Sequence, residues 1–172
     1  MNLLFDHIKV ERTLKRITHE ILERSLDLDS IVLLGIKNSG VPLAKIIQEN
    51  LKAFEGIDVP RYDLDISFYR DDAKKKESEK LTIDLTDKHV ILIDDVLFTG
   101  RTARAAMDAV VDLGRPKKIQ LAVLIDRGHR ELPIRADYIG KNIPTQQSEK
   151  IVVDITHKKG VMLLKEDENG SH

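Results

Sequence analysis

The first pattern of apolar positions along the chain is helical. A spacing of i, i+4, i+7 and i+11 places four apolar residues on one side of a helix: Val10, Leu14, Ile17 and Ile21. The opposite side carries basic residues, namely Arg12, Lys15, Arg16 and His19, while Arg24 lies near the edge of the apolar stripe. This pattern predicts an amphipathic helix that covers a core and turns a basic face to solvent.

Continuous apolar runs predict strands that are buried on both faces at 31–34 and 90–93, and the run 121–125 predicts a third such strand over 119–125. Helices are predicted at about 42–54 and 102–113, the second ended by Gly114 and Pro116. The alternation over 63–69 predicts a further strand, and weaker strands are expected near 151–153 and 161–164. The order of elements predicts a single α/β domain over 1–165, with a mostly parallel sheet flanked by helices on both faces.

Two segments have no apolar anchor. The charged stretch 71–80 predicts a mobile excursion, and the polar residues 166–172 predict a frayed tail.

Composition narrows the class of protein. The 172 residues include 28 Lys and Arg against 29 Asp and Glu, so the net charge of −1 excludes a generic polybasic binder of nucleic acids or anionic membranes. The absence of cysteine excludes disulfides, thiolate metal sites and cysteine nucleophiles. No apolar run approaches the roughly 20 residues of a spanning helix, and the N-terminus does not resemble a signal peptide. We therefore expect a soluble cytoplasmic protein that makes no membrane contact.

Polar side chains follow the first four predicted strands, at the edge where open parallel sheets bind ligands. These segments are 37–40, 70–72, 94–102 and 126–129. Each contains glycine, charge or hydroxyl groups, which is the chemistry that binds a phosphorylated ligand.

The segment 90–102 is the most informative. Gly100 lets backbone N–H groups approach an oxyanion, Thr99 and Thr102 add hydroxyl donors, and the next helix points its positive end to the same place. Asp94 and Asp95 would repel a phosphate unless they hold sugar hydroxyls or a Mg²⁺ ion through water. A sugar phosphate carrying Mg²⁺-pyrophosphate meets these demands; the alternative is a helix-capping turn with solvated carboxylates.

The sequence VILIDDVLFTGRT of this segment resembles the phosphoribosyl-pyrophosphate (PRPP) binding signature of type I phosphoribosyltransferases. The stretch 123–153 is similar to the pyrimidine operon regulators (the PyrR family), and the resemblance extends to 16–20, 68–72 and nearly the whole chain except the tail. The resemblance implies the type I fold, with a small hood region beside the sheet. It also implies an mRNA-binding attenuator that has uracil phosphoribosyltransferase activity.

The resemblance implies roles for individual residues. The expected catalytic residues are Asp94, Asp95 and Arg70, in a reaction that converts uracil and PRPP to UMP and pyrophosphate. The two aspartates would hold Mg²⁺ through water. The residues that would bind PRPP or nucleotide are Lys37, Asn38, Ser39, Gly40, Asp94, Asp95, Val96, Leu97, Phe98, Thr99, Gly100, Arg101 and Thr102. Asp126 and Arg127 would face the base.

Departures from the family pattern affect this site. Asn38-Ser39 replaces the usual Thr-Arg, so a guanidinium that could hold pyrophosphate is missing. Phe98 replaces the usual Tyr, and the excursion after Asp72 is shorter than usual. Since a charge-assisted contact to phosphate is worth roughly 1.5–3 kcal/mol, we expect weakened use of PRPP.

The resemblance also gives the basic residues a second interpretation besides solvated surface charge. The expected RNA-binding set is Arg12, Lys15, Arg16, His19, Arg24, His129, Arg130, Arg135 and Lys141. UMP or PRPP in the strand-end site would change the affinity for a pyrimidine operon mRNA leader, and a homodimer or higher homo-oligomer is expected. The alternative function is a salvage phosphoribosyltransferase without an RNA role.

Overall fold

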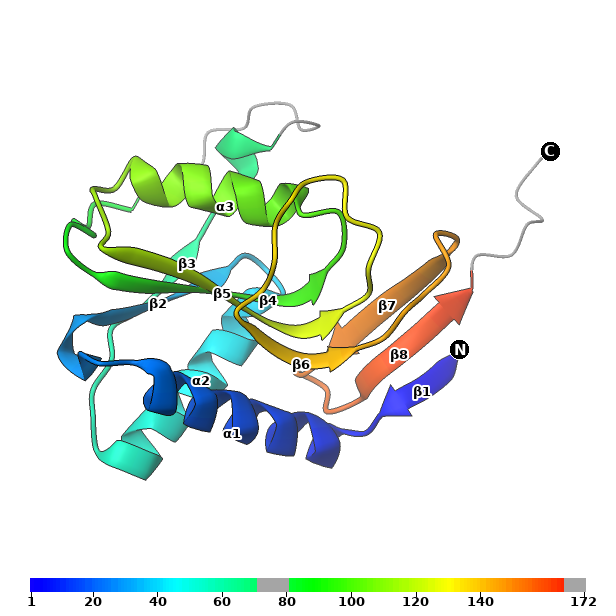
Figure 1. Ribbon diagram of the computed structural model, residues 1–172. Coiled ribbons are helices and arrows are strands. Elements are labelled where there is room, and N and C mark those ends of the chain that lie inside the picture. The colour runs from blue at the N-terminus through cyan, green and yellow to red at the C-terminus, as the bar shows by residue number, and fades with distance from the viewer. Residues whose placement is uncertain (71–80, 166–172) are drawn as a thin grey trace.

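The computed structural model describes residues 1–70 and 81–165; the predicted excursion and tail lie outside these ranges. A five-stranded parallel sheet forms the centre (Figure 1), in the order β3 (Arg61–Leu64), β2 (Ile31–Ile36), β4 (His89–Leu97), β5 (Lys118–Asp126) and β6 (Tyr138–Asn142). One face is covered by α1 (His7–Arg24) and α2 (Gly40–Glu55), and the other by α3 (Arg101–Val111). The predicted α/β class is confirmed.

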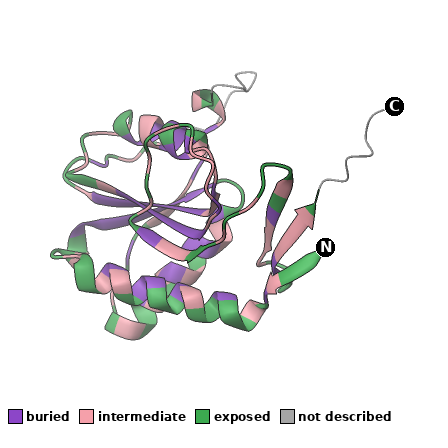
Figure 2. Ribbon diagram, turned by 45° about the vertical axis from the view of Figure 1, so that its right-hand side comes forward, coloured by how far each residue is buried: buried purple, intermediate pink, exposed green. Residues whose placement is uncertain are grey.

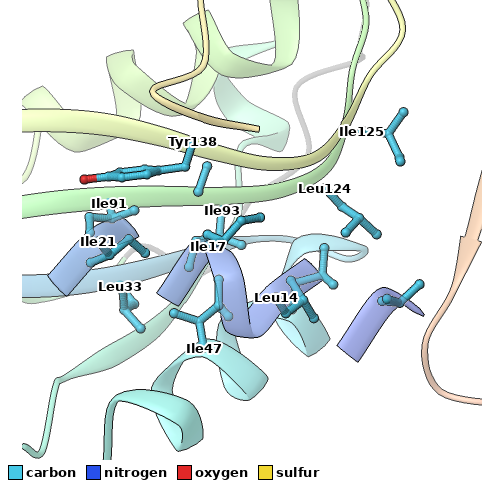
Figure 3. Packing of buried hydrophobic residues seen from close by; sticks show 14 of the residues in the cluster. Leu14, Ile17, Ile21, Leu33, Ile47, Ile91, Ile93, Leu124, Ile125 and Tyr138 are labelled. Atoms are coloured by element: carbon cyan, nitrogen blue, oxygen red, sulfur yellow. The ribbon is translucent and has the colours of Figure 1, made fainter. Parts of the chain in front are cut away.

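The central strands are buried on both faces because every second side chain packs into a different core. Ile91 and Ile93 face α1 and α2 in one cluster (Figure 3), whereas Val90 and Leu92 pack with α3 in the other. Figure 2 shows buried strands between helices whose outer surfaces are exposed. These two cores explain why the strands read as continuous apolar runs.

A second, antiparallel sheet forms the small hood beside the main one (Figure 1). It consists of β1 (Asn2–Phe5), β8 (Gly160–Lys165) and β7 (Glu149–Asp154), with β8 in the middle. The strands expected near 151–153 and 161–164 are therefore confirmed. The sequence pattern did not predict β1 or β6.

The strand predicted over 63–69 is wrong in its second half. The Asp65 carboxylate accepts hydrogen bonds from the N–H (2.9 Å) and hydroxyl (2.6 Å) of Ser67, which turns the chain out of the sheet. The turn continues as the short 3₁₀ helix η2 (Ser67–Tyr69), in which Phe68 is exposed. The Tyr69 hydroxyl donates to Asp112 beyond α3 at 2.5 Å, which fastens η2 to that helix.

Another 3₁₀ helix, η1 (Leu28–Ser30), leads from α1 into β2. No helix in the described ranges is both long and apolar enough to cross a membrane.

Candidate functional site

The loops after β2 and β4 meet where the chain leaves the sheet in opposite directions. From β2 the chain runs through α2 to β3, and from β4 through α3 to β5, on the other side. Such a switch point is where open α/β sheets bind ligands. Gly40 begins α2 so close to β4 that an added Cβ would lie 2.1 Å from the Ile93 carbonyl oxygen. The predicted loops 37–40 and 94–102 are thus brought together.

An acidic pair lies in the last part of β4 at this junction, because the strand continues to Leu97 and not only to the predicted residue 93. Asp94 is only 8% exposed, and its carboxylate accepts from the Asp95 N–H at 2.8 Å and the Ser39 hydroxyl at 3.3 Å. Asp95 in turn accepts from the Val96 N–H at 2.7 Å. Burial raises the pKa of Asp94 well above its usual value, and repulsion from Asp95 raises it further. Bound cationic or hydroxyl groups would relieve this unfavourable charge.

The next loop forms a cradle before α3. Gly100 has a φ of 94°, in the left-handed region that favours glycine, and it directly precedes the first turn of the helix. A cavity of about 410 Å³ lies here, lined by Arg70, Asp94, Val96, Leu97, Phe98, Thr99, Gly100, Arg101, Thr102, Ala103, Leu121 and Val123. Hydroxyls, arginines and a helix N-terminus at one cavity suit an anion next to the acidic pair.

The other residues predicted to bind nucleotide or to act in catalysis come from the loop after β2 and from the end of η2. Lys37, Asn38 and Ser39 are exposed on the loop after β2, where the Lys37–Asn38 peptide bond is cis. Arg70 directly follows η2 and lines the cavity.

Asp126 and Arg127, the two residues expected to face the nucleobase, occupy different surroundings. Asp126 lines a second cavity of about 630 Å³, together with Arg130, Leu132, Pro133, Ile134, Arg135, Ala136, Ile139 and Asn142. Arg127 is 6% exposed, and its guanidinium lies 4.0 Å from the centre of the Phe98 ring. Burial lowers the pKa of Arg127. Neither residue is part of the lining of the first cavity.

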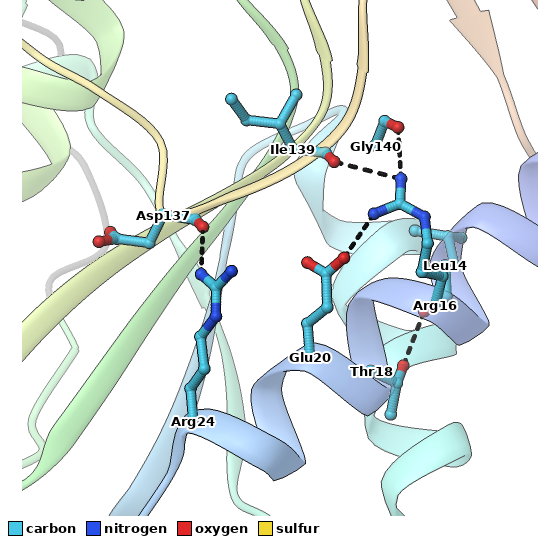
Figure 4. Close-up of polar contacts among 8 residues, drawn as sticks. All are labelled: Leu14, Arg16, Thr18, Glu20, Arg24, Asp137, Ile139 and Gly140. Atoms are coloured by element: carbon cyan, nitrogen blue, oxygen red, sulfur yellow. Dashed lines mark hydrogen bonds and ion pairs between the residues drawn. The ribbon is translucent and has the colours of Figure 1, made fainter.

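Two arginines of α1 reach the backbone of β6 (Figure 4). Arg16 donates to the carbonyls of Gly140 (2.5 Å) and Ile139 (3.2 Å), and Arg24 donates to that of Asp137 (2.8 Å). The helix comes this close because position 140 has no side chain: a Cβ there would lie 2.8 Å from the Cγ2 atom of Thr13 on α1. Both arginines therefore hold α1 against the sheet while remaining at the surface.

The other cations of the expected RNA-binding set differ in exposure. Those exposed on α1 are Arg12, Lys15 and His19, the last stacked on Phe54 with ring centres 4.5 Å apart, and Arg135 and Lys141 are exposed beyond β5. His129 and Arg130 are half-buried. Together with Arg16 and Arg24, seven members of the set are therefore exposed at the surface.

Lys9 joins this surface, although the sequence analysis did not select it. The Lys9 and Lys141 ammonium groups lie 4.5 and 5.6 Å from the centre of the same Phe5 ring. Lys9 precedes Arg16 by seven residues, which is two helical turns, so this spacing was a signal in the sequence.

Comparisons with known proteins agree with this geometry. The family model for the phosphoribosyl transferase domain matches residues 2–159. The chain is 56% identical over 169 residues to "Bifunctional protein PyrR" of Streptococcus mutans, covering 95% of this chain and 96% of the relative. It is 53% identical over 168 residues to the "Pyrimidine operon regulatory protein" of Lactococcus lactis, covering 95% and 97%.

Solved structures support the fold. The hypoxanthine phosphoribosyltransferase of Trypanosoma cruzi aligns with a TM-score of 0.71 over 97% of this chain and 98% of that one, at 18% identity. At this identity the likeness concerns the fold alone.

Proposed function

Since the chain belongs to the phosphoribosyl transferase domain family and, within it, to the PyrR proteins, we propose that it regulates a pyrimidine operon and acts as a uracil phosphoribosyltransferase. The observation that carries the enzymatic part is the junction after β4. Near the end of that strand, the buried Asp94 is bonded to the loop after β2 and lines a cavity together with hydroxyls and a helix N-terminus. This arrangement supports a site that holds ribose and phosphate side by side.

In the proposed reaction, uracil N1 displaces pyrophosphate from C1 of PRPP and yields UMP. Asp94 and Asp95 would hold the ribose hydroxyls, the loop 98–102 the 5′-phosphate, and the loop 37–40 the pyrophosphate. Arg70, which lines the same cavity, supplies positive charge near the departing anion. The protein thus positions the reactants and stabilises charge without forming a covalent bond to them. Asp126 and Arg127 remain our candidates for the side that faces the base.

The residues present also fit a Mg²⁺ ion brought in by PRPP. Among the described residues, no group of three His, Asp or Glu side chains is placed to hold a metal ion. Mg²⁺ commonly keeps several waters and binds through one or two carboxylates plus substrate phosphates. Asp94 and Asp95 would hold the ion through its water, and when bound it would neutralise charge on the pyrophosphate.

Weak use of PRPP is part of the proposal. Ser39 is exposed, and its hydroxyl bonds Asp94 instead of supplying a positive charge to the ligand. Replacing Asn38-Ser39 by Thr-Arg should lower the KM for PRPP by about 10- to 100-fold, which corresponds to a contact of roughly 1.5–3 kcal/mol. Steady-state kinetics of uracil conversion measure this, and an unchanged KM would contradict the assigned role of the loop.

The regulatory part of the proposal rests on the exposed cations of α1, β6 and the segment 127–137. The partner would be the mRNA leader of a pyrimidine operon, bound by phosphate contacts and RNA shape, because only 4% of the residues are aromatic. UMP or PRPP in the strand-end site would change this affinity. We expect the protein to act in the cytoplasm as a homodimer or higher homo-oligomer, which light scattering coupled to gel filtration measures.

A gel-shift titration with a pyrimidine leader hairpin, with and without UMP, tests the regulatory function. We expect specific binding that UMP tightens and that Arg135→Ala with Lys141→Ala greatly weakens. The double variant Lys45→Ala with Lys52→Ala, which removes two exposed charges of α2, serves as the matched control. Activity on uracil without specific RNA binding at any salt concentration would favour the salvage enzyme instead.

A further inference from the structure

The segment 127–137 lies directly against the loop that would hold the phosphate. The Thr99 carbonyl accepts hydrogen bonds from the N–H groups of Glu131 (2.9 Å) and Leu132 (3.2 Å). A Cβ added to Gly100 would lie 3.4–3.6 Å from the side chains of Leu132 and Ile134. Figure 1 shows this segment, between β5 and β6, arching beside the start of α3. The candidate ligand loop and part of the candidate RNA surface therefore share an interface.

Arg130 is the side chain that ties the two together. Its guanidinium donates to the Phe98 carbonyl at 2.6 Å, to the Ile134 carbonyl at 2.9 Å, and to the Asp126 carboxylate at 2.5 Å. The side chain is only 25% exposed. Three acceptors from three parts of the chain thus converge on one planar group, the geometry for which arginine is suited.

The ring of Phe98 is held from the same segment. Arg127 packs on it at 4.0 Å, and the ring of His129 meets it edge-on with centres 5.8 Å apart. Arg127 is itself anchored by hydrogen bonds of 2.9 Å to the Thr145 hydroxyl and the Gln146 carbonyl. The carbonyl and the ring of Phe98 are therefore both fixed by residues that follow β5.

We propose that Arg130 is a positioning residue that couples the phosphate loop to the segment 127–137, so that UMP bound at the loop changes RNA affinity through it. The inference rests on the proposed function. In a trans peptide the C=O and N–H point in opposite directions, so the unit joining Phe98 to Thr99 offers Arg130 its carbonyl and keeps its N–H on the other side. A phosphate accepting from the loop polarises and orders the same peptide units that accept from Arg130, Glu131 and Leu132.

Coupling of this kind is reciprocal, since two ligands that bias one element must change each other's affinity by the same factor. The exposed cation on the coupled segment is Arg135, which lines the second cavity together with Arg130. Arg130 would act through its contacts inside the chain, and Arg135 through direct contact with RNA. Substitution of these two arginines should therefore give different results.

The experiment compares the ratio of RNA dissociation constants without and with saturating UMP in wild type, Arg130→Ala, Arg130→Lys and Arg135→Ala. We expect the ratio to fall to about one in Arg130→Ala and to an intermediate value in Arg130→Lys, whose ammonium cannot span three acceptors. In Arg135→Ala both constants should rise while their ratio keeps the wild-type value. An unchanged ratio in Arg130→Ala, with both constants raised equally, would overturn the inference and make Arg130 a plain RNA contact.

UMP calorimetry gives a second readout that needs no RNA. Arg130→Ala should bind UMP at least about tenfold more weakly than wild type, Arg130→Lys should recover part of this loss, and Lys45→Ala serves as the control. Wild-type UMP affinity in both Arg130 variants would refute the positioning role. Failure of wild type to bind the RNA would contradict the proposed regulation as a whole. RNA binding with no UMP effect in wild type would contradict the proposed UMP dependence and the coupling through Arg130, but not the RNA binding itself. A UMP effect that persists in Arg130→Ala would contradict the coupling alone.

Discussion

The close approach of α2 to β4 makes Gly40→Ala a severe change at the site. The new Cβ would lie 2.1 Å from the Ile93 carbonyl oxygen and 3.2 Å from the Cα of Asp94, whereas real Cβ atoms essentially never come within 3.0 Å of such neighbours. The backbone atoms cannot rotate away as a flexible side chain would. The start of α2 must therefore retreat from β4 by about 0.9 Å or more.

This displacement has a cost that can be estimated. Overpacking of a tight core contact costs about 1–3 kcal/mol, and the Ser39–Asp94 hydrogen bond, already 3.3 Å long, would be lost at about 1 kcal/mol. For a domain of 172 residues, a total of about 2–4 kcal/mol lowers Tm by roughly 5–15 °C. Because a misplacement of about 1 Å at reacting groups costs up to about 100-fold in rate, kcat/KM for PRPP should fall at least about tenfold.

Thermal unfolding and uracil-dependent kinetics measure both effects. The matched control is Gly56→Ala at the other end of the same helix, where nothing lies within 4 Å and only the left-handed φ of 65° is penalised. We expect the free energy of unfolding of the control variant to fall by about 1 kcal/mol and its kinetics with PRPP to stay those of wild type. If Gly40→Ala matches Gly56→Ala in both Tm and kcat/KM, the reasoning about the helix approach is wrong.

Other predictions concern single groups. Burial lowers the pKa of His89, so the free energy of unfolding should be highest above about pH 6.5 and fall as pH drops toward the folded pKa, because the unfolded chain then binds the proton first. In urea titrations, His89→Gln should reduce this pH-dependent decrease in the free energy of unfolding. An unchanged pH dependence would contradict the role assigned to His89. The hydrogen bond to Asp112 raises the pKa of Tyr69 to about 12. Asp112→Asn should return this pKa toward 10.0 in an absorbance titration, and an unchanged tyrosine titration would contradict the assigned contact. Lys9→Ala should reduce the salt dependence of RNA binding by about one unit of slope, and a slope equal to that of Lys45→Ala would exclude Lys9 from the RNA surface.

Much of the fold was predictable because its central strands are buried on both faces. Runs such as 90–93 need no tertiary information, since a strand between two cores is apolar at every position. The edge strand β6 reads Tyr-Ile-Gly-Lys-Asn and was missed, because it owes its place to pairing with β5 and to contacts with α1. The alternation over 63–69 misled because a local hydrogen bond from the Ser67 hydroxyl to the Asp65 carboxylate outweighed a pattern of only a few residues.

The candidate site was predictable to the extent that strand ends determine it. Asp94, Gly100 and Gly40 were selected because parallel strands bring their carboxyl ends to one edge, and the structure places them there. The contacts of the arginines were not predictable in this way. Nothing in the sequence around Arg130 or Arg16 distinguishes a guanidinium in solvent from one that binds backbone carbonyls far along the chain.

The contacts of Arg16 and Arg24 also bear on self-association. An outermost strand ordinarily offers unpaired carbonyls to which a strand of another molecule can add, which is a route to aggregation. Here two guanidinium groups already occupy acceptors at 137, 139 and 140. The helix that carries the candidate RNA surface thereby also occupies backbone acceptors along this outermost strand, and replacing Arg16 or Arg24 would release them for pairing with another molecule.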